Sequence, residues 1–130
     1  MTLTLYAVTA AVFLILDGIM LTFVMKPLFT RHIGSLLVEP IRVAPAALFY
    51  LAYVAGLVYL VSLPALKTGA PLVVPALIIG LMAYGTYEFT SWSIMKDWHW
   101  QMVATDVTWG GVLTAFSAWA GVMITRMIHG

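Results

Sequence analysis

The chain has 130 residues, of which 63% are hydrophobic and only 8% carry a charge, and its formal net charge is +1. Soluble domains are roughly half apolar and about one-quarter charged, so this composition predicts a membrane protein with several spans. The small net charge excludes an electrostatic case for nucleic-acid binding. The chain contains no cysteine, which excludes disulfides, thiol catalysis and cysteine-ligated metals.

Four apolar segments follow one another, and each reaches the ~20 residues that a membrane span needs. Their approximate limits are residues 3–25, 44–63, 71–95 and 98–128. The first is expected to end at Lys26 and Pro27 and the second at Pro64, because proline interrupts helices. No basic region precedes the first segment, so we expect a span there rather than a cleaved signal peptide. Asp97 is the expected N-cap of the fourth segment.

Only one connection between the segments is long. Residues 26–43 mix apolar with charged side chains, and we expect them to form a short amphipathic segment on the membrane surface. The other connections are tight turns, and the chain shows no repeat and no linker. The sequence therefore predicts a single domain over residues 1–130. Its fold class is an all-α integral membrane protein, a four-helix antiparallel transmembrane bundle with one amphipathic surface segment.

The basic residues of the connections indicate an orientation, because cytoplasmic loops are enriched in Lys and Arg. One side of the predicted bundle holds four of them, namely Lys26, Arg31, Arg42 and Lys96. The other side holds Lys67 and Arg126. This difference favours a multi-pass topology with both termini outside and the long connection in the cytoplasm.

Asp17, Glu88 and Asp106 fall inside the predicted spans, where an acidic residue costs about 2.5–3.5 kcal/mol near the helix centre. Counted from Lys26, Lys96 and Asp97 at 1.5 Å per residue, each lies roughly 12–14 Å from the same side of the membrane. Nothing in the composition forces this agreement, since the fourth span runs opposite to the first and third. We therefore expect the three carboxyl groups to share one layer inside the bundle.

Aromatic residues extend this predicted layer. Tyr50 and Tyr53 lie roughly 9–14 Å in from Ala44. On the third and fourth spans, helical spacing places Tyr84 on the face of Glu88 and Trp109 on the face of Asp106. The candidate ligand-binding or proton-binding residues are Asp17, Glu88, Asp106, Tyr50, Tyr53, Tyr84, Tyr87 and Trp109.

Helical spacing makes two further predictions about packing. Trp92 and Met95 are expected to share the inward face of the third span with Glu88. Small residues in the second and fourth spans predict close approaches between helices. The positions concerned are Ala52, Gly56, Gly110, Thr114, Ser117 and Gly121.

No Lys or Arg is expected at the depth of the three acids. We therefore expect at least one of the carboxyl groups to stay protonated at neutral pH, and the three to titrate as a coupled unit. Neither a metal nor a cofactor is predicted, because His32, His99 and His129 lie at span ends, away from the carboxylates. Interfacial anchoring by tryptophan is the favoured interpretation of the W-H-W stretch around His99, and a ligand site is the alternative. His32 and His99 could also meet on the cytoplasmic face.

Three functions stay open. The first is a membrane protein that binds a small ligand or handles protons in the polar layer, which a water-filled path would support. The second is an accessory or structural subunit of a larger membrane complex, with dry and fully hydrogen-bonded acids. The third, least favoured, is an intramembrane lipid-modifying enzyme using acid–base catalysis, since no nucleophile or zinc motif is present. The expected partners are the lipid bilayer and either further copies of the chain or a larger complex.

Several motifs occur in a specific order along the chain. They are LD at residues 16–17, IGSLL at 33–37, FYLAYVAGL at 49–57, PAL at 64–66, AYGTYEFTSW at 83–92 and DVTWGGVL at 106–113. In these motifs the chain resembles the bacterial membrane family called domain of unknown function 2177. It departs from that pattern at Glu88, Ser91 and His99, where the family tends to carry Asp, Asn and Pro. The resemblance implies a small four-helix protein of the bacterial inner membrane, and it implies no activity.

Overall fold

The computed structural model describes residues 1–37 and 42–130, and within these ranges it contains helices and no strand. Four helical runs are long and apolar enough to cross a membrane. They are Thr2–Leu36, Val43–Thr68, Val73–Ile94 and Trp100–His129. The prediction of an all-α membrane bundle with four spans is therefore confirmed.

The first run is longer than expected. It consists of α1 (Thr2–Met20), a π-helical turn η1 (Leu21–Met25), α2 (Lys26–Ile33) and a short 3₁₀ turn η2 (Gly34–Leu36). The expectation that the helix ends at Lys26 and Pro27 is wrong, because the widened π turn immediately before Pro27 accommodates the proline ring. Lys26 donates its N–H to the carbonyl of Leu21, five residues earlier. Residues 26–36 thus continue the first helix, and the amphipathic helix α2 is joined to it rather than separate from it. Residues 38–41 of the expected 26–43 segment lie outside the described residues.

The second run repeats this arrangement. It consists of α3 (Val43–Leu57), the π turn η3 (Val58–Ser62) and α4 (Leu63–Thr68). Leu63 donates to the carbonyl of Val58, and Pro64 follows directly. The helix therefore passes the expected end at Pro64 and stops only at Gly69, whose φ of 72° provides the left-handed conformation of a helix C-terminus.

The last two runs form a hairpin of α5 (Val73–Ile94) and α6 (Trp100–His129). The N-cap of α6 is His99, whose Nδ1 accepts the Gln101 N–H at 3.1 Å. Asp97, the expected cap, instead occupies the turn between the helices with a φ of 71°. This left-handed residue reverses the chain so that the segment after it folds back against α5.

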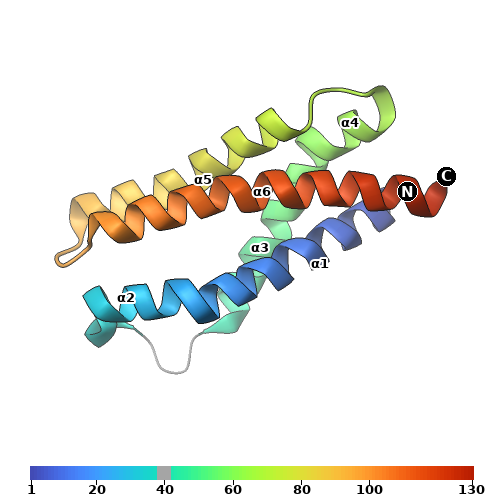
Figure 1. Ribbon diagram of the computed structural model, residues 1–130. Helices are drawn as coiled ribbons and strands as arrows, with labels where there is room; N and C mark the ends of the chain where they lie inside the picture. The colour runs from blue at the N-terminus through green and yellow to red at the C-terminus, as the bar shows by residue number, and fades with distance from the viewer. Residues whose placement is uncertain (38–41) are drawn as a thin grey trace.

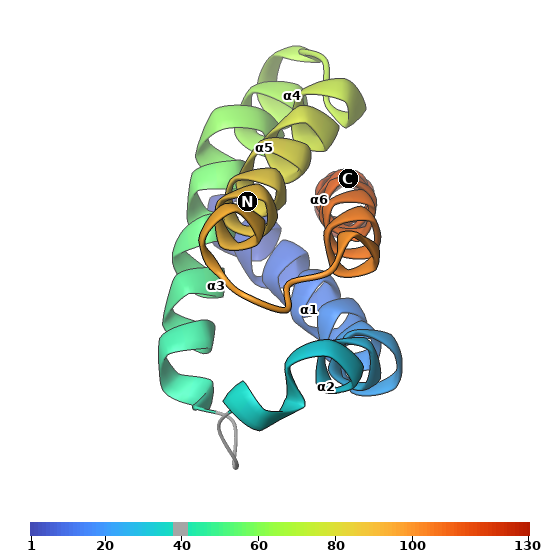
Figure 2. The same cartoon turned by 90° about the vertical axis from the view of Figure 1, so that its left-hand side faces the viewer.

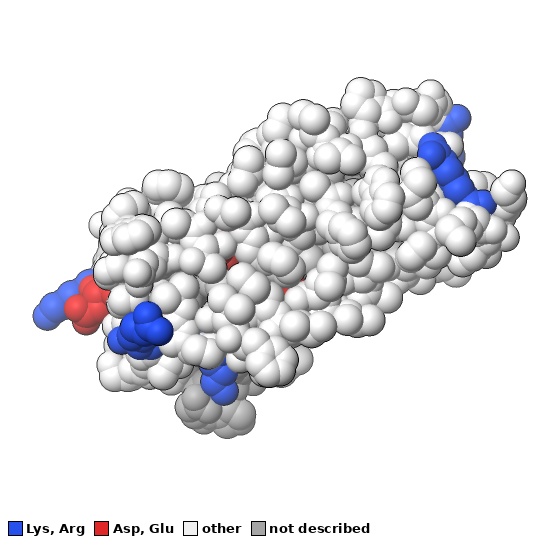
Figure 3. All heavy atoms as spheres, viewed as in Figure 1, with Lys and Arg blue, Asp and Glu red and all other residues white. Residues whose placement is uncertain are grey.

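Figure 1 shows the runs alternating in direction, with α6 between α5 and α1 and both termini at the same end of the bundle. We call that end the terminal end, and the opposite end, with α2 and residues 95–99, the loop end. Figure 2 shows α3 and α4 clearly inclined to α6. Figure 3 shows basic side chains at both ends and, between them, a broad band without Lys or Arg in which only small patches of acidic atoms are visible, as expected for a chain that crosses a membrane.

The hairpin is held together where α5 and α6 lie unusually close. A side-chain carbon added to Gly80 would collide with the backbone of Gly110 and Gly111. Tyr84, one turn further along α5, packs directly over Gly110. The predicted close approach at Gly110 is confirmed, and Gly80 is a second contact point that the sequence pattern had not indicated.

A second close approach joins α6 to α1 near the terminal end. A side-chain carbon on Gly121 would collide with Thr9, which confirms the prediction at Gly121. The prediction for the second span is wrong, because Ala52 is exposed and the space around Gly56 is open. The four positions predicted on α6, Gly110, Thr114, Ser117 and Gly121, are all buried, whereas Ala52 and Gly56 of α3 are exposed.

The inward face of α5 is narrower than predicted. Tyr84 is partly buried, and Glu88 and Ser91 are buried. Trp92 and Met95, which were expected on the same face, are 44% and 37% exposed. Trp92 lies one position off the strip of α5 that contacts α6 and therefore turns outward, whereas Met95 follows the last residue of the helix in extended backbone and leaves that face.

Candidate functional site

Three buried acidic side chains meet in the half of α5 and α6 nearer the loop end. Asp17 of α1 is 3% exposed, Glu88 of α5 is 0% exposed and Asp106 of α6 is 8% exposed. Asp106 lies between the other two, since its carboxyl group neighbours that of Glu88 and is within electrostatic range of that of Asp17. We call the series Glu88, Asp106 and Asp17 the acid row.

One end of the acid row is closed by Trp98. The indole Nε1 of Trp98 donates to Oε1 of Glu88 at 3.1 Å. Trp98 is only 7% exposed, and its ring packs edge-on against Phe29 of α2 and Tyr87 of α5, with centroids 5.4 and 5.8 Å away. The other oxygen of Glu88, Oε2, is buried without a hydrogen-bond partner.

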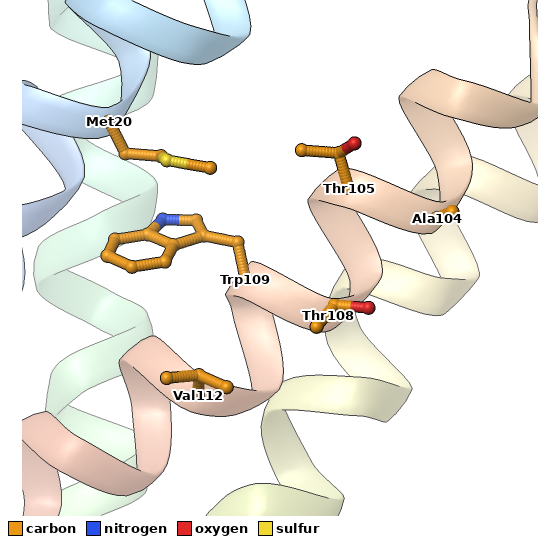
Figure 4. A pocket seen from close by; sticks show the side chains of 6 residues that line it. All are labelled: Met20, Ala104, Thr105, Thr108, Trp109 and Val112. Atoms are coloured by element: carbon orange, nitrogen blue, oxygen red, sulfur yellow. The ribbon is translucent and has the colours of Figure 1, made fainter.

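The other end of the acid row is held by Trp109. Its Nε1 donates to Oδ1 of Asp17 at 3.1 Å, which joins α6 to α1. Oδ2 of Asp17 is buried and has no hydrogen-bond partner. The same indole also forms part of the wall of an open hollow between α1 and α6, where Met20 faces Thr105 and Trp109 (Figure 4). Asp17 is therefore separated from the outside of the bundle by a single aromatic ring.

Two tyrosines approach the Asp17 end of the acid row. Tyr50 lies close to both Asp17 and Tyr84, and Tyr84 also lies within electrostatic range of Asp106. The hydroxyl of Tyr84 is buried without a hydrogen-bond partner. The glycine at position 110 leaves room for the Tyr84 ring against α6, which brings this hydroxyl toward the acids. A small rotation of either tyrosine would supply a donor to a carboxylate.

Two other predicted tyrosines lie outside this cluster. Tyr53 forms a hydrogen bond of 2.9 Å with Thr114, further toward the terminal end than Asp106. Its ring packs on Phe13, with centroids 5.7 Å apart. Tyr87 is 52% exposed and contacts Trp98 through its ring. Equal depth alone was thus insufficient to place a side chain, since the direction in which it leaves its helix also matters.

The turn before α6 contributes a residue that sequence reasoning had not assigned to the site. Trp98 was interpreted as an interfacial anchor, yet it is buried against Glu88, whereas Trp100 is 57% exposed. The rings of His99 and His32 stack with centroids 4.2 Å apart and an interplanar angle of 10°. The possibility that these two histidines meet is therefore confirmed. The tight turn after α5, which returns the chain toward Glu88, is the signal that could have identified Trp98.

The chemistry available to the acid row follows from its donors and acceptors. The two indole N–H groups donate to Glu88 and Asp17, and one further buried oxygen of each of these acids lacks a hydrogen-bond partner. Adjacent carboxyl groups can hydrogen-bond to each other only when one of them carries a proton. Within the described part of the chain, no group of three or more His, Asp or Glu side chains has the geometry of a metal site. The arrangement suits binding of protons or of a small hydrogen-bonding ligand.

Comparison with known proteins gives the family of this chain. A family model described as "Predicted membrane protein (DUF2177)" matches residues 2–123, which is nearly the whole chain. No curated protein and no solved structure matches. The match includes every member of the acid row together with Trp98 and Trp109. The chain therefore belongs to the DUF2177 family of predicted membrane proteins.

Proposed function

We propose that this protein binds and exchanges protons, or a small ligand that replaces them, at the acid row within the bacterial inner membrane. The observation that carries the proposal is that the acid row has fewer hydrogen-bond donors than carboxyl oxygens. Three buried carboxyl groups share two indole donors, and two of their oxygens have no partner. The basic side chains visible in Figure 3 lie at the ends of the bundle, not beside the acids.

Electrostatics explains why such a row would hold protons. An ionised carboxylate in a low-dielectric interior costs several kcal/mol unless it is paired and fully hydrogen-bonded. Three negative charges within reach of one another would add mutual repulsion to that cost. Binding a proton removes one charge and supplies the missing donor between neighbouring carboxyl groups. The row is thus built to remain partly protonated and to titrate as a unit.

The order of the side chains suggests a direction for exchange. Glu88 is sealed by Trp98, Asp106 occupies the centre, and Asp17 lies behind Trp109 at the edge of an open hollow. A proton that reaches the row through the hydroxyl groups of Tyr50 and Tyr84, which lie near Asp17, would meet Asp17 first and Glu88 last. In this proposal Asp17 exchanges the proton and Glu88 stores it.

Infrared spectroscopy of the protein in nanodiscs tests this proposal, because the carbonyl of a protonated carboxylic acid absorbs separately from a carboxylate. Spectra would be recorded across a pH titration for the native protein and for Glu88→Gln and Asp106→Asn. We expect a carbonyl band that persists at neutral pH and that disappears in one of the variants. Trp100→Phe is the matched control, since Trp100 is exposed and lies outside the row.

A different result would remove the basis of the proposal. If no protonated carbonyl band is present at neutral pH, the three acids are ionised and paired in some other way. A band that survives in both variants would assign the proton to a group outside the Glu88 and Asp106 pair. In that case proton storage at Glu88 would be wrong.

A structural subunit of a larger membrane complex is the second candidate. The observation that favours it is that Glu88 has no exposed surface, as expected for an acid that only joins helices. The unpartnered oxygens of Glu88 and Asp17 argue against it, because a purely structural network would satisfy them. Under this second function, the three acids would show no titration between mildly acidic and neutral pH.

A further inference from the structure

A continuous groove runs along the outside of the bundle between the first helical run and α6. Two open hollows of about 400 and 520 Å³ make up this groove. Ala104 and Thr105 line both, so the hollows adjoin along α6. We call the combined feature the α6 groove.

The sequence of α6 explains why the groove is hollow. Its floor is made of the small side chains of Ala104, Thr105 and Thr108, which lie between the large rings of Trp100 and Trp109. Residues spaced by four along a helix fall on one face, so these positions form a trough between two aromatic ends. Figure 4 shows Met20 of α1 and Trp109 of α6 at the deeper end of this trough.

The two ends of the groove differ in polarity. Arg31, Gln101 and Trp100 line the end that lies nearer the loop end of the bundle. The other end, which lies closer to the middle of the bundle and is called the deeper end, is lined by Met20, Val112, Trp109 and the threonines. None of the described lining residues is acidic. A molecule with a negatively charged head and an apolar tail would therefore match the groove from one end to the other.

The length of the groove matches one leaflet of a membrane. From Trp100 to Val112 the helix rises by ~18 Å at 1.5 Å per residue. Half of the hydrocarbon core of a bilayer is about 15 Å thick. The charged end of the groove thus falls at the membrane interface when the deeper end reaches the middle of the bilayer. An acyl chain that lies along the membrane normal has the same direction and extent.

We propose that the α6 groove binds an anionic phospholipid, with one acyl chain along the trough and the phosphate group paired with Arg31. The planar guanidinium of arginine matches two phosphate oxygens, and Trp100 lies where interfacial tryptophans commonly contact headgroups. The inference goes beyond proton binding and does not depend on it. It also places the end of the acyl chain against Trp109, the ring whose other contact is Asp17.

Lipid retention measured by native mass spectrometry tests the headgroup contact. The full-length protein in detergent would be given phosphatidylglycerol or phosphatidylcholine with identical acyl chains. We expect the native protein to retain phosphatidylglycerol in preference, and Arg31→Gln to weaken that binding about tenfold, as for loss of one charge-assisted hydrogen bond. Lys26→Gln is the matched control, because Lys26 is exposed on the same helix but does not line the groove.

A second pair of variants tests the acyl-chain contact. Ala104→Phe fills the floor of the trough and should reduce retention of both lipids at least tenfold, whereas Ala52→Phe, at an exposed position on α3, should leave it unchanged. Equal losses in Arg31→Gln and Lys26→Gln would show only non-specific attraction and overturn the headgroup site. Undiminished retention in a folded Ala104→Phe protein would overturn the groove as the place of the chain. If that variant does not fold, the Arg31 and Lys26 pair decides the proposal.

Discussion

Each end of the acid row accepts one hydrogen bond from a tryptophan, but the two ends differ in how far they are enclosed. Trp98 donates to Glu88 and Trp109 donates to Asp17, in both cases at 3.1 Å. Trp98 is packed between Phe29 and Tyr87, whereas Trp109 borders the open groove. The same kind of hydrogen bond therefore accompanies two different environments. Trp98 encloses Glu88 completely, whereas Trp109 leaves Asp17 beside an open hollow.

Breaking the contact between α5 and α6 should have the largest effect, because that contact holds Glu88 against Asp106. Gly80→Ala places a carbon against the backbone of Gly110 and Gly111, which cannot move aside as a side chain can. We expect a loss of about 3 kcal/mol in the free energy of unfolding, the upper part of the range for overpacking. Unfolding in mixed detergent micelles measures it.

Gly56→Ala is the matched control for this substitution. The space around Gly56 is open, and alanine favours a helix by up to about 1 kcal/mol over glycine. The control is therefore expected to be neutral or slightly stabilising. A loss as large as that of Gly80→Ala would show that any glycine replacement harms these helices, and that the close approach at Gly80 is unimportant.

Removing each indole donor in turn tests the comparison itself. Trp98→Phe leaves Glu88 without its hydrogen bond in a closed site, and we expect a loss of about 2 kcal/mol. Trp109→Phe should cost less than about 1 kcal/mol, because the hydroxyl of Tyr50 lies close enough to Asp17 to replace the lost donor. Equal losses from the same micelle unfolding measurement would contradict the difference in enclosure.

A smaller effect is expected at His99, which precedes α6 next to Trp98 and contacts His32 of α2. His99→Ala removes the N-cap of α6 and the stack on His32, and should cost about 1 kcal/mol. His129→Ala, an exposed position at the other end of the same helix, should stay within about 0.5 kcal/mol. Loss of helical circular dichroism on heating compares the two variants. Identical curves would mean that the turn around His99 adds nothing to the enclosure of Glu88.

Single cysteines that report orientation are expected to leave the fold intact. The native chain has none, so Asp97→Cys and Gly130→Cys each introduce a unique label site. With the termini outside the cytoplasm, an impermeant maleimide should label Gly130→Cys in intact spheroplasts and Asp97→Cys only after lysis. The reverse pattern would place the loop end, and with it Arg31 and the open end of the α6 groove, on the outer side.

The proximity of the three acids could be predicted from sequence, but their surroundings could not. Counting residues from Lys26 placed Asp17 level with the other two acids even though the helix continues past Lys26, because the count uses only the helical rise. The helix ends themselves were misplaced at Pro27 and Pro64. A π turn before each proline removes the clash that proline rules assume, and no simple pattern announces it.

The direction in which side chains leave each helix was the second feature that the sequence did not predict correctly. Tyr53 and Tyr50 differ by less than one turn, yet Tyr53 bonds to Thr114 whereas Tyr50 approaches Asp17. Trp98 was misassigned because its place depends on the turn at Asp97, whose left-handed conformation is unusual for a residue other than glycine. Both errors involve tertiary packing, which spacing along one helix does not encode.

The most direct test of the account is whether the acid row titrates as one unit. Infrared spectra of Asp106→Asn would be compared with those of the native protein, after Glu88→Gln and Asp17→Asn have assigned the bands of the two outer acids. Because Asp106 lies between them, we predict that its replacement shifts both the Glu88 and the Asp17 titrations toward those of isolated groups. Titrations of both acids that stay unchanged in Asp106→Asn would contradict a coupled, proton-holding row.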